Sequence, residues 1–356
     1  MPAVTEVRIL DARQPDPAGI AHAAGILRAG GLVAFPTETV YGLGVHALDA
    51  DAVRRLFAAK GRPAEDPLIV HVPDVDALAA LTTGVPGTAS ALASRFWPGP
   101  LTMVLHRSAA VPREVTAGLE TVAIRVPAHP IAHALLVASA VPIAAPSANL
   151  FSRPSPTRAE HVLQDLDGRI DLVIDGGSTT VGLESTVIDL TGSIPTILRP
   201  GAVTLEMIRG VLPDARMTER ASGGLAGPMK SPGLLARHYS PRAPLTLYEG
   251  SAARVISRMA ADASAAMAQG QRVGIVAADE DDFSGASNHA LKVVRLGPET
   301  DAASLAANLY NALRVLDEWG VDLILARTFV DHSGLIVAIH DRLRRAAAGR
   351  MVQVDT

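Results

Sequence analysis

Lysine is rare in this sequence, and one of its lysines lies where phosphate chemistry is expected. Only three of the 32 basic residues are lysines, and Lys60 opens the segment Lys60-Gly61-Arg62-Pro63, between a helical pattern and the apolar run 68–72. A compact ammonium group suits phosphate oxygens, whereas arginine offers a planar fork. A cation is also favourable at the solvated end of a helix, so the charge pattern alone leaves both interpretations open.

Several other segments place hydroxyl, amide or cationic groups after short apolar runs. They are the segments 36–44, 145–149, 175–177 and 184–189, followed by Arg199. Ligands of open α/β sheets bind at the carboxyl ends of strands, and glycine-rich turns expose backbone N–H groups to anions. Together they predict a site for a polyanion, although turn-forming side chains, a core histidine or a structural ion pair would explain single residues equally well.

The elements that must position these residues alternate between helical and strand-like patterns. The predicted helices of the first region are 18–29, 49–60, 86–96, 129–139 and 157–165. Its predicted strands are 32–35, 68–72, 101–106, 121–126, 142–145, 171–175, 185–190 and 196–198. Helices mixed with strands, some of them adjacent in sequence, predict an α/β layer fold with a mixed sheet.

A connector rich in glycine and proline divides the chain. Residues 218–233 contain too many helix and strand breakers to continue either element, so we expect a first domain over 1–217, a linker over 218–243 and a second domain over 244–356. The second domain is predicted to hold strands at 245–248, 272–277, 291–295 and 322–326 and helices at 251–268, 301–318 and 335–347. This spacing indicates a small, parallel, Rossmann-like sheet, but without the G-x-G-x-x-G fingerprint of a dinucleotide site.

Composition excludes several classes of protein. The 356 residues are 48% hydrophobic and 3% aromatic, with a net charge of −4 and no cysteine. A disordered chain, a stacking platform for single-stranded nucleic acid, a disulfide scaffold, a zinc ribbon and a thiol nucleophile are therefore not expected. The first ten residues lack the apolar run of a signal peptide, and the longest apolar stretch, 130–146, is interrupted. We expect a soluble, cytoplasmic enzyme without a membrane partner.

In combination and order, these motifs resemble the YrdC-like superfamily. The similar segments are 36–44, Lys60-x-Arg62 with Pro67-Leu68 and His71, 96–102, 125–127, Ser147-x-Asn149 and 184–189. Ser231-Pro232-Gly233, Arg237-His238-Tyr239 and 341–343 are similar to the linker and tail of the longer, two-domain members, the threonylcarbamoyl-AMP synthases. The resemblance implies a YrdC-like twisted mixed sheet with a concave cleft, plus a smaller Rossmann-like domain.

The resemblance implies a nucleotidyl transfer in which L-threonine, bicarbonate or CO2 and ATP give threonylcarbamoyl-AMP and pyrophosphate. Lys60, Arg62 and Mg²⁺ would stabilise the leaving group. The implied ATP-binding residues are Lys60, Arg62, Asp66, Thr121, Ser147, Asn149, Ser155, Arg199 and Tyr239. The implied threonine-binding residues are Thr37, His71, Arg125 and Ser185, with Arg125 pairing the carboxylate. The product would pass to a tRNA threonylcarbamoyl transferase, and direct binding of tRNA is not expected at this net charge.

Three segments depart from the family pattern, and two alternative functions are compatible with the same fold. Asp66 stands where the family usually has asparagine, so we expect it to lie near the metal ion. Leu150-Phe151-Ser152 and Leu234-Leu235-Ala236 also differ from the usual residues. The alternatives are an RNA-binding module and a regulatory ATP-binding protein of the same fold. The absence of cysteine argues strongly against a carbamoyl-phosphate enzyme of hydrogenase maturation, since those proteins add zinc-binding cysteine clusters.

Overall fold

The computed structural model describes residues 4–218, 238–286, 289–331 and 333–354. Its contacts divide the chain into two compact units. The larger unit comprises residues 1–151 and 155–234, and the smaller unit comprises residues 152–154 and 235–356. Most of the predicted linker, 218–243, lies outside the described residues.

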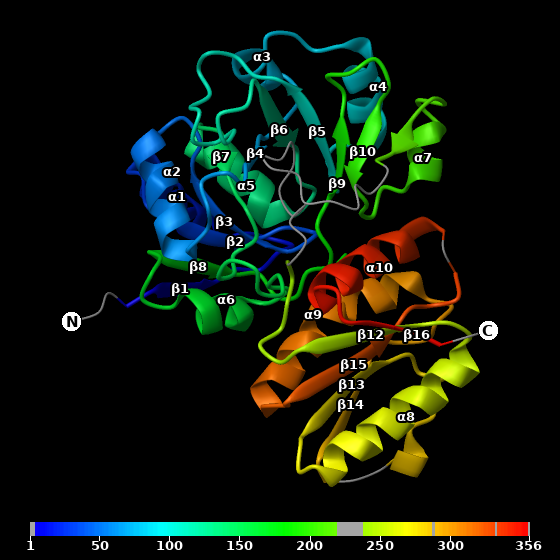
Figure 1. The fold of residues 1–356 in the computed structure, drawn as a ribbon. Coiled ribbons are helices and arrows are strands. Elements are labelled where there is room, and N and C mark those ends of the chain that lie inside the picture. Colours follow the sequence, from blue (N-terminus) through cyan, green and yellow to red (C-terminus); the bar gives the residue numbers. More distant parts are fainter. Residues whose placement is uncertain (1–3, 219–237, 287–288, 332, 355–356) are drawn as a thin grey trace. The chain divides into compact units, whose positions relative to one another are not determined.

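The larger unit is built on a mixed, eleven-stranded sheet in the described part of the chain, with the strand order β1-β8-β2-β3-β7-β4-β6-β5-β9-β10-β11 (Figure 1). The strands are β1 (Glu6–Ile9), β2 (Val33–Pro36), β3 (Tyr41–His46), β4 (Ile69–His71), β5 (Leu101–His106), β6 (Thr121–Arg125), β7 (Ile143–Ala144), β8 (Leu172–Asp175), β9 (Thr186–Asp189), β10 (Thr196–Arg199) and β11 (Arg216–Met217). The sheet contains parallel pairs such as β4–β6 and antiparallel pairs such as β5–β6, which confirms the predicted mixed sheet.

The helices of this unit are α1 (Pro17–Arg28), α2 (Ala50–Lys60), α3 (Leu78–Leu81), α4 (Gly87–Phe96), α5 (Pro130–Ser139), α6 (Ala159–Leu166) and α7 (Leu205–Arg209). Helix α2 carries Lys60 at its end, and residues close in sequence determine where this helix begins and ends. The Asp49 carboxylate accepts hydrogen bonds from the N–H groups of Asp51 and Ala52, and Gly61 ends the helix in the left-handed region with φ 60°. Lys60 is therefore the last helical residue.

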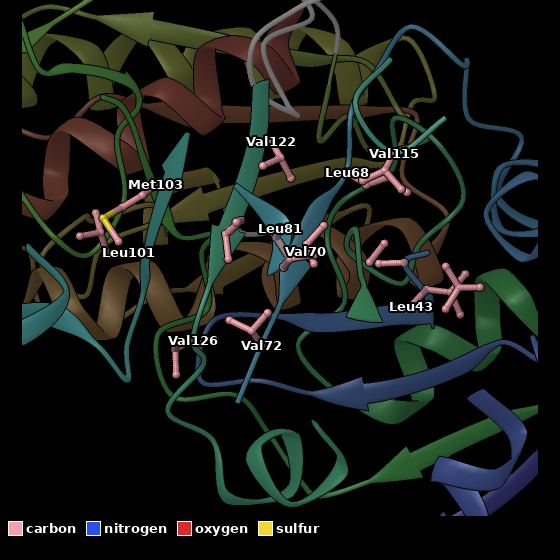
Figure 2. Close-up of a cluster of buried hydrophobic side chains, with 14 of the residues drawn as sticks. Leu43, Leu68, Val70, Val72, Leu81, Leu101, Met103, Val115, Val122 and Val126 are labelled. Carbon is pink, nitrogen blue, oxygen red and sulfur yellow. The ribbon is translucent and has the colours of Figure 1, made fainter. Parts of the chain in front are cut away.

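Alternation along β4, β5 and β6 separates two faces of the sheet. Val70, Met103 and Val122 belong to the main apolar core, as Figure 2 shows. Ile69 and Ala123 belong instead to a small apolar cluster that also holds Val104 and Val187. We call the side of the sheet with this small cluster the polar face, because His71 and Arg125 follow Ile69 and Ala123 at intervals of two.

The smaller unit is a five-stranded parallel sheet with the order β14-β13-β15-β12-β16. Its strands are β12 (Leu245–Glu249), β13 (Val273–Ala277), β14 (Leu291–Arg295), β15 (Leu323–Arg327) and β16 (Met351–Gln353). Helix α8 (Ala252–Ala268) covers one face, and α9 (Ala302–Trp319) and α10 (Gly334–Ala347) cover the other (Figure 1); a 3₁₀ turn, η1, spans Ser284–Ala286. The predicted small, parallel, Rossmann-like sheet is confirmed.

Three residues from the middle of the sequence belong to this smaller unit. The main-chain carbonyl of Ser152 accepts a hydrogen bond from Ser240 N at 2.7 Å. Arg153 Nη2 lies 3.3 Å from Asp317 Oδ2, and Asp317 also accepts hydrogen bonds from the N–H of Arg242. A side-chain and main-chain network thus fixes Ser152–Pro154 in the smaller unit.

The segment 36–44 is not the loop that the sequence predicts. Only residues 37–40 form a turn, and Tyr41–His46 return as β3, antiparallel to β2. A Cβ at Gly44 would lie 2.7 Å from the ring of Phe35, so this glycine makes room for a core aromatic side chain, not for a phosphate group. The sequence also gave no signal for the short elements β1, α3, α7, β11 and β16.

Within the described ranges, no helix combines the length and the apolar character that crossing a membrane requires.

Candidate active site

Lys60 is buried, and its ammonium group faces the loop that follows β7. Its side chain is 1% exposed, and Nζ donates hydrogen bonds to the main-chain carbonyl of Ser147, at 2.5 Å, and to that of Asn149. The carbonyl of Lys60 in turn accepts a hydrogen bond from Phe151 N at 2.9 Å. The end of α2 and the 147–151 loop are therefore joined by hydrogen bonds in both directions.

Arg62 and Asp66 form a buried ion pair four residues apart. Arg62 Nη2 lies 2.9 Å from Asp66 Oδ2, and both side chains are less than 5% exposed. Arg62 also donates to the main-chain carbonyls of Asp66, at 3.1 Å, and Pro67, at 2.8 Å. Asp66 thus orients the Arg62 guanidinium, a role for which an asparagine would lack the charge.

Arg125 ends β6 on the polar face, and three groups hold its guanidinium. Its Nε donates to the carbonyl of Gly99 at 3.2 Å, and its Nη1 donates to Thr39 Oγ1 at 2.8 Å. Its Nη2 lies 2.7 Å from Glu38 Oε1 in an ion pair. The turn between β2 and β3 therefore supplies two of the three groups that contact this predicted threonine-binding arginine.

His71 lies beside Arg125, because β4 and β6 are parallel and pair these two residues. Burial first, and the positive charge of Arg125 second, lower the pKa of His71 to about 3. The ring of His71 is therefore neutral at physiological pH, and it meets the ring of Phe35 edge to face. A neutral imidazole can exchange hydrogen bonds with a hydroxyl group without repelling the neighbouring guanidinium.

Ser185 and Arg199 meet at the neighbouring strands. Arg199 donates from Nε and Nη2 to the carbonyl of Ser185, at 3.1 and 3.0 Å, and from Nη2 to Ser185 Oγ at 3.2 Å. The hydroxyl of Ser185 is 2.8 Å from that of Thr102. All three side chains are buried, so this small network is fixed by its own hydrogen bonds.

The four remaining predicted residues lie in four different places. The Ser155 hydroxyl donates to the Glu184 carboxylate, and the Thr37 hydroxyl donates to the carbonyl of Val40 at 2.7 Å. Thr121 begins β6 and shares the polar face with Arg125, four residues further on. Tyr239 belongs to the smaller unit, where its ring is 5.6 Å from that of Tyr310.

Two family models match this chain. A model described as telomere recombination matches residues 25–201, and one described as threonylcarbamoyl-AMP synthase, C-terminal domain, matches residues 203–348. The threonylcarbamoyl-AMP synthase of Pyrococcus abyssi is 46% identical over 93% of this chain and 95% of its own length. That of Bacillus subtilis is 46% identical over 94% of both chains. The chain belongs to the threonylcarbamoyl-AMP synthase family.

The solved structures agree with this assignment. The crystal structure of Pyrococcus abyssi Sua5 complexed with L-threonine superimposes with a TM-score of 0.91, at 44% identity, over 98% of this chain and 100% of that one. The family assignment confirms the predicted activity, the formation of threonylcarbamoyl-AMP, and the predicted combination of a YrdC-like sheet with a smaller α/β domain. It does not support the RNA-binding or purely regulatory alternatives.

The residues of the site would fit a Mg²⁺ ion only if a bound nucleotide supplied most of its ligands. No three His, Asp or Glu side chains converge anywhere in the described ranges. Mg²⁺ usually keeps several waters and binds through one or two carboxylates and substrate phosphates. Asp66, which is ion-paired with Arg62, is the only carboxylate among the residues that the sequence predicts for the site.

Sequence reasoning missed four side chains that the structure places in contact with predicted site residues. These are Glu38 and Thr39 at Arg125, Thr102 at Ser185, and Glu184 at Ser155. Glu38 and Glu184 each carried a signal, since each is a carboxylate inside a predicted site segment, 36–44 or 184–189. Thr102 and its partner Ser185 are 83 positions apart, and a local sequence pattern cannot predict a pair so distant.

Proposed function

We propose that the larger unit binds ATP and L-threonine side by side on the polar face of its sheet and joins them through CO2 or bicarbonate. The observation that supports this most directly is that Lys60 with Arg62, Arg125 and Arg199, from three distant segments, all lie at strand ends and loops of one sheet. An N-carboxylated threonine would attack the α-phosphorus of ATP there, and pyrophosphate would leave.

Catalysis in this proposal needs no side-chain nucleophile. Lys60 and Arg62 place fixed positive charge where negative charge builds on the departing pyrophosphate. Both are already held by main-chain carbonyls, so little reorganisation is needed during the reaction. Mg²⁺ bound with ATP would neutralise further phosphate charge, with Asp66 as its neighbour.

The rest of the proposal divides the predicted residues between two substrates. The nucleotide would contact Ser147, Asn149, Ser155, Thr121, Arg199 and Tyr239. Threonine would contact Arg125 through its carboxylate and Thr37, His71 and Ser185 through its remaining polar groups. A separate tRNA threonylcarbamoyl transferase would take the product, in the cytoplasm, without direct binding of tRNA by this chain.

Pyrophosphate release tests this proposal. Purified protein with ATP, Mg²⁺ and bicarbonate should release pyrophosphate only when L-threonine is added. Lys60→Ala should lower turnover by about 10²-fold or more, the order expected for loss of a preorganised charge donor. Lys292→Ala, a lysine of β14 in the smaller unit, is the matched control and should leave turnover unchanged. Release without threonine, or normal turnover of Lys60→Ala, would contradict the proposal.

A further inference from the structure

The Glu38 carboxylate has an environment that the role of Arg125 alone does not explain. Its side chain is 12% exposed and ion-paired to Arg125, which is 4% exposed. Yet neither of its oxygens accepts a hydrogen bond from any residue in the described ranges, although both atoms are buried. A buried carboxylate can accept several hydrogen bonds, and its burial is costly when it accepts none.

Glu38 is not needed to hold the backbone or to orient Arg125. Its main-chain carbonyl accepts hydrogen bonds from Val181 N, at 2.8 Å, and from the Thr180 hydroxyl, at 3.3 Å, so the turn is fixed by other groups. Gly99 and Thr39 already hold two edges of the Arg125 guanidinium. The Glu38 carboxylate therefore lies beside the Arg125 guanidinium without being required for the position of the turn or of the arginine.

The imidazoles near this pair do not add positive charge at neutral pH. Burial and the Arg125 charge lower the pKa of His71 to about 3. Burial also lowers the pKa of His129, although the Glu38 carboxylate opposes this shift. One anion and one cation thus face each other at 2.7 Å with neutral rings around them.

An α-amino acid has the complementary pair of charges. Its carboxylate and its ammonium group are attached to one carbon atom, and the ammonium group has three N–H donors. If the substrate carboxylate binds Arg125, its ammonium group lies within reach of an acceptor adjacent to that guanidinium. One ion pair within the protein would be replaced by two between protein and substrate, with no net charge left buried.

We propose that Glu38 binds the α-ammonium group of the amino-acid substrate and so selects an amino acid over other hydroxy acids. This inference rests on the proposed binding of the threonine carboxylate to Arg125. It makes Glu38 a specificity-determining residue that acts before the amine is carboxylated.

Glu38→Gln tests the proposal because it keeps the size of the side chain and removes its charge. Its KM for L-threonine in pyrophosphate release should rise by about 10- to 100-fold, the range expected when a charge-assisted hydrogen bond is lost. Its KM for ATP should stay within about twofold of the wild-type value, since this pair does not contact the nucleotide in the proposed arrangement. Glu38→Asp, which keeps the charge, should recover part of the threonine affinity.

A deaminated ligand separates recognition of the ammonium group from a merely structural role. In 2,3-dihydroxybutanoate with the threonine configuration, a hydroxyl group replaces the ammonium group. As a competitive inhibitor it should bind Glu38→Gln at least as tightly as wild type, so the preference for threonine over the analogue should fall by about 10-fold or more. Thermal unfolding of each variant checks that the fold is retained.

The outcomes distinguish the two proposals. If Glu38→Gln weakens threonine and the analogue equally, or leaves the threonine KM unchanged, binding of the ammonium group by Glu38 is wrong. If Arg125→Gln affects neither ligand, the underlying placement of the threonine carboxylate is wrong. Loss of both ligands in Arg125→Gln, together with selective loss of threonine in Glu38→Gln, supports both.

Discussion

Two buried arginines end strands in the two sheets, and their surroundings differ sharply. Arg125 of β6 is paired with one carboxylate that accepts no hydrogen bond from the described residues. Arg327 of β15 is paired with two carboxylates. Asp281 accepts hydrogen bonds from Nε and Nη2 of Arg327, and Glu299 accepts them from Nη1 and Nη2.

The carboxylates around Arg327 are also held by the backbone. Asp281 accepts a hydrogen bond from Ala278 N at 3.0 Å, and Glu299 accepts one from Val330 N at 2.8 Å. Hydrogen bonds and charge from Glu299 and Asp281 outweigh burial and raise the pKa of Arg327. A strand-end arginine whose partners are themselves satisfied acts as a structural clamp, whereas the Arg125–Glu38 pair keeps hydrogen-bonding capacity for a substrate.

The largest expected effect is on catalysis when both charges of the Arg125–Glu38 pair are removed. The double variant Glu38→Gln/Arg125→Gln should lower kcat/KM for L-threonine by about 100-fold or more, because both substrate charges lose their partners. Its free energy of unfolding should change by only about 1 kcal/mol, since neither charge is left alone. Substrate-dependent rates and urea unfolding measure the two effects, and an unchanged rate would make this pair structural.

Arg327→Gln should show the opposite pattern. It leaves Asp281 and Glu299 without their cation, so the smaller unit should lose about 3–5 kcal/mol of unfolding free energy. The two tryptophans lie in different units, Trp97 in the larger and Trp319 in the smaller, so fluorescence in a Trp97→Phe background reports on this unit alone. A loss of activity in the folded variant, without a loss of unfolding free energy, would contradict a purely structural role for Arg327.

The unfolding of the larger unit should depend on pH because of its buried histidine, His71. His71 has a pKa of about 3 when folded, below its ordinary value near 6.5, so the folded state binds fewer protons between these values. The contribution of His71 to the free energy of unfolding is fully present about one pH unit above 6.5 and falls as the pH drops, by about 2 kcal/mol in total at pH 5. Trp97 fluorescence in a Trp319→Phe background measures it. His71→Gln should flatten this slope by about the same amount, and an equal slope in both proteins would contradict a buried neutral ring.

The smallest expected effect concerns the hydroxyl pair beside Arg199. Thr102→Val keeps the shape of a buried side chain and removes its hydrogen bond to Ser185, which should cost about 1 kcal/mol of unfolding free energy. Because Arg199 also binds the Ser185 hydroxyl, kcat/KM for threonine should fall by no more than about tenfold. Ser257→Ala, on an exposed face of α8, is the matched control.

The sequence predicts features that depend on neighbouring residues. Lys60, Arg62 and Asp66 lie within seven positions, and the helix that ends at Lys60 follows from its cap and from Gly61. The alternation of β6 similarly predicts that Arg125 lies on a strand face. These signals are local, so they need no knowledge of the topology.

Features that depend on distant pairings could not be predicted. Glu38 and Arg125 are 87 positions apart, and the strand order β2-β3-β7-β4-β6 brings the turn after β2 to the end of β6. The glycines of 36–44 suggested a ligand loop, because glycine gives no indication of whether it makes room for a ligand or for a core ring such as Phe35. The family resemblance supplied the substrates, which no spacing reveals.

Double labelling of the product tests the central claim most directly. Wild-type protein given ATP labelled at the α-phosphorus, bicarbonate and carbon-labelled L-threonine should form one nucleotide product that contains both labels. Arg327→Gln, at a temperature where it is folded, should form the same product, and Glu38→Gln/Arg125→Gln should not. Equal product from wild type and the double variant, or a product with the phosphorus label alone, would contradict binding of threonine beside ATP at the Arg125–Glu38 pair.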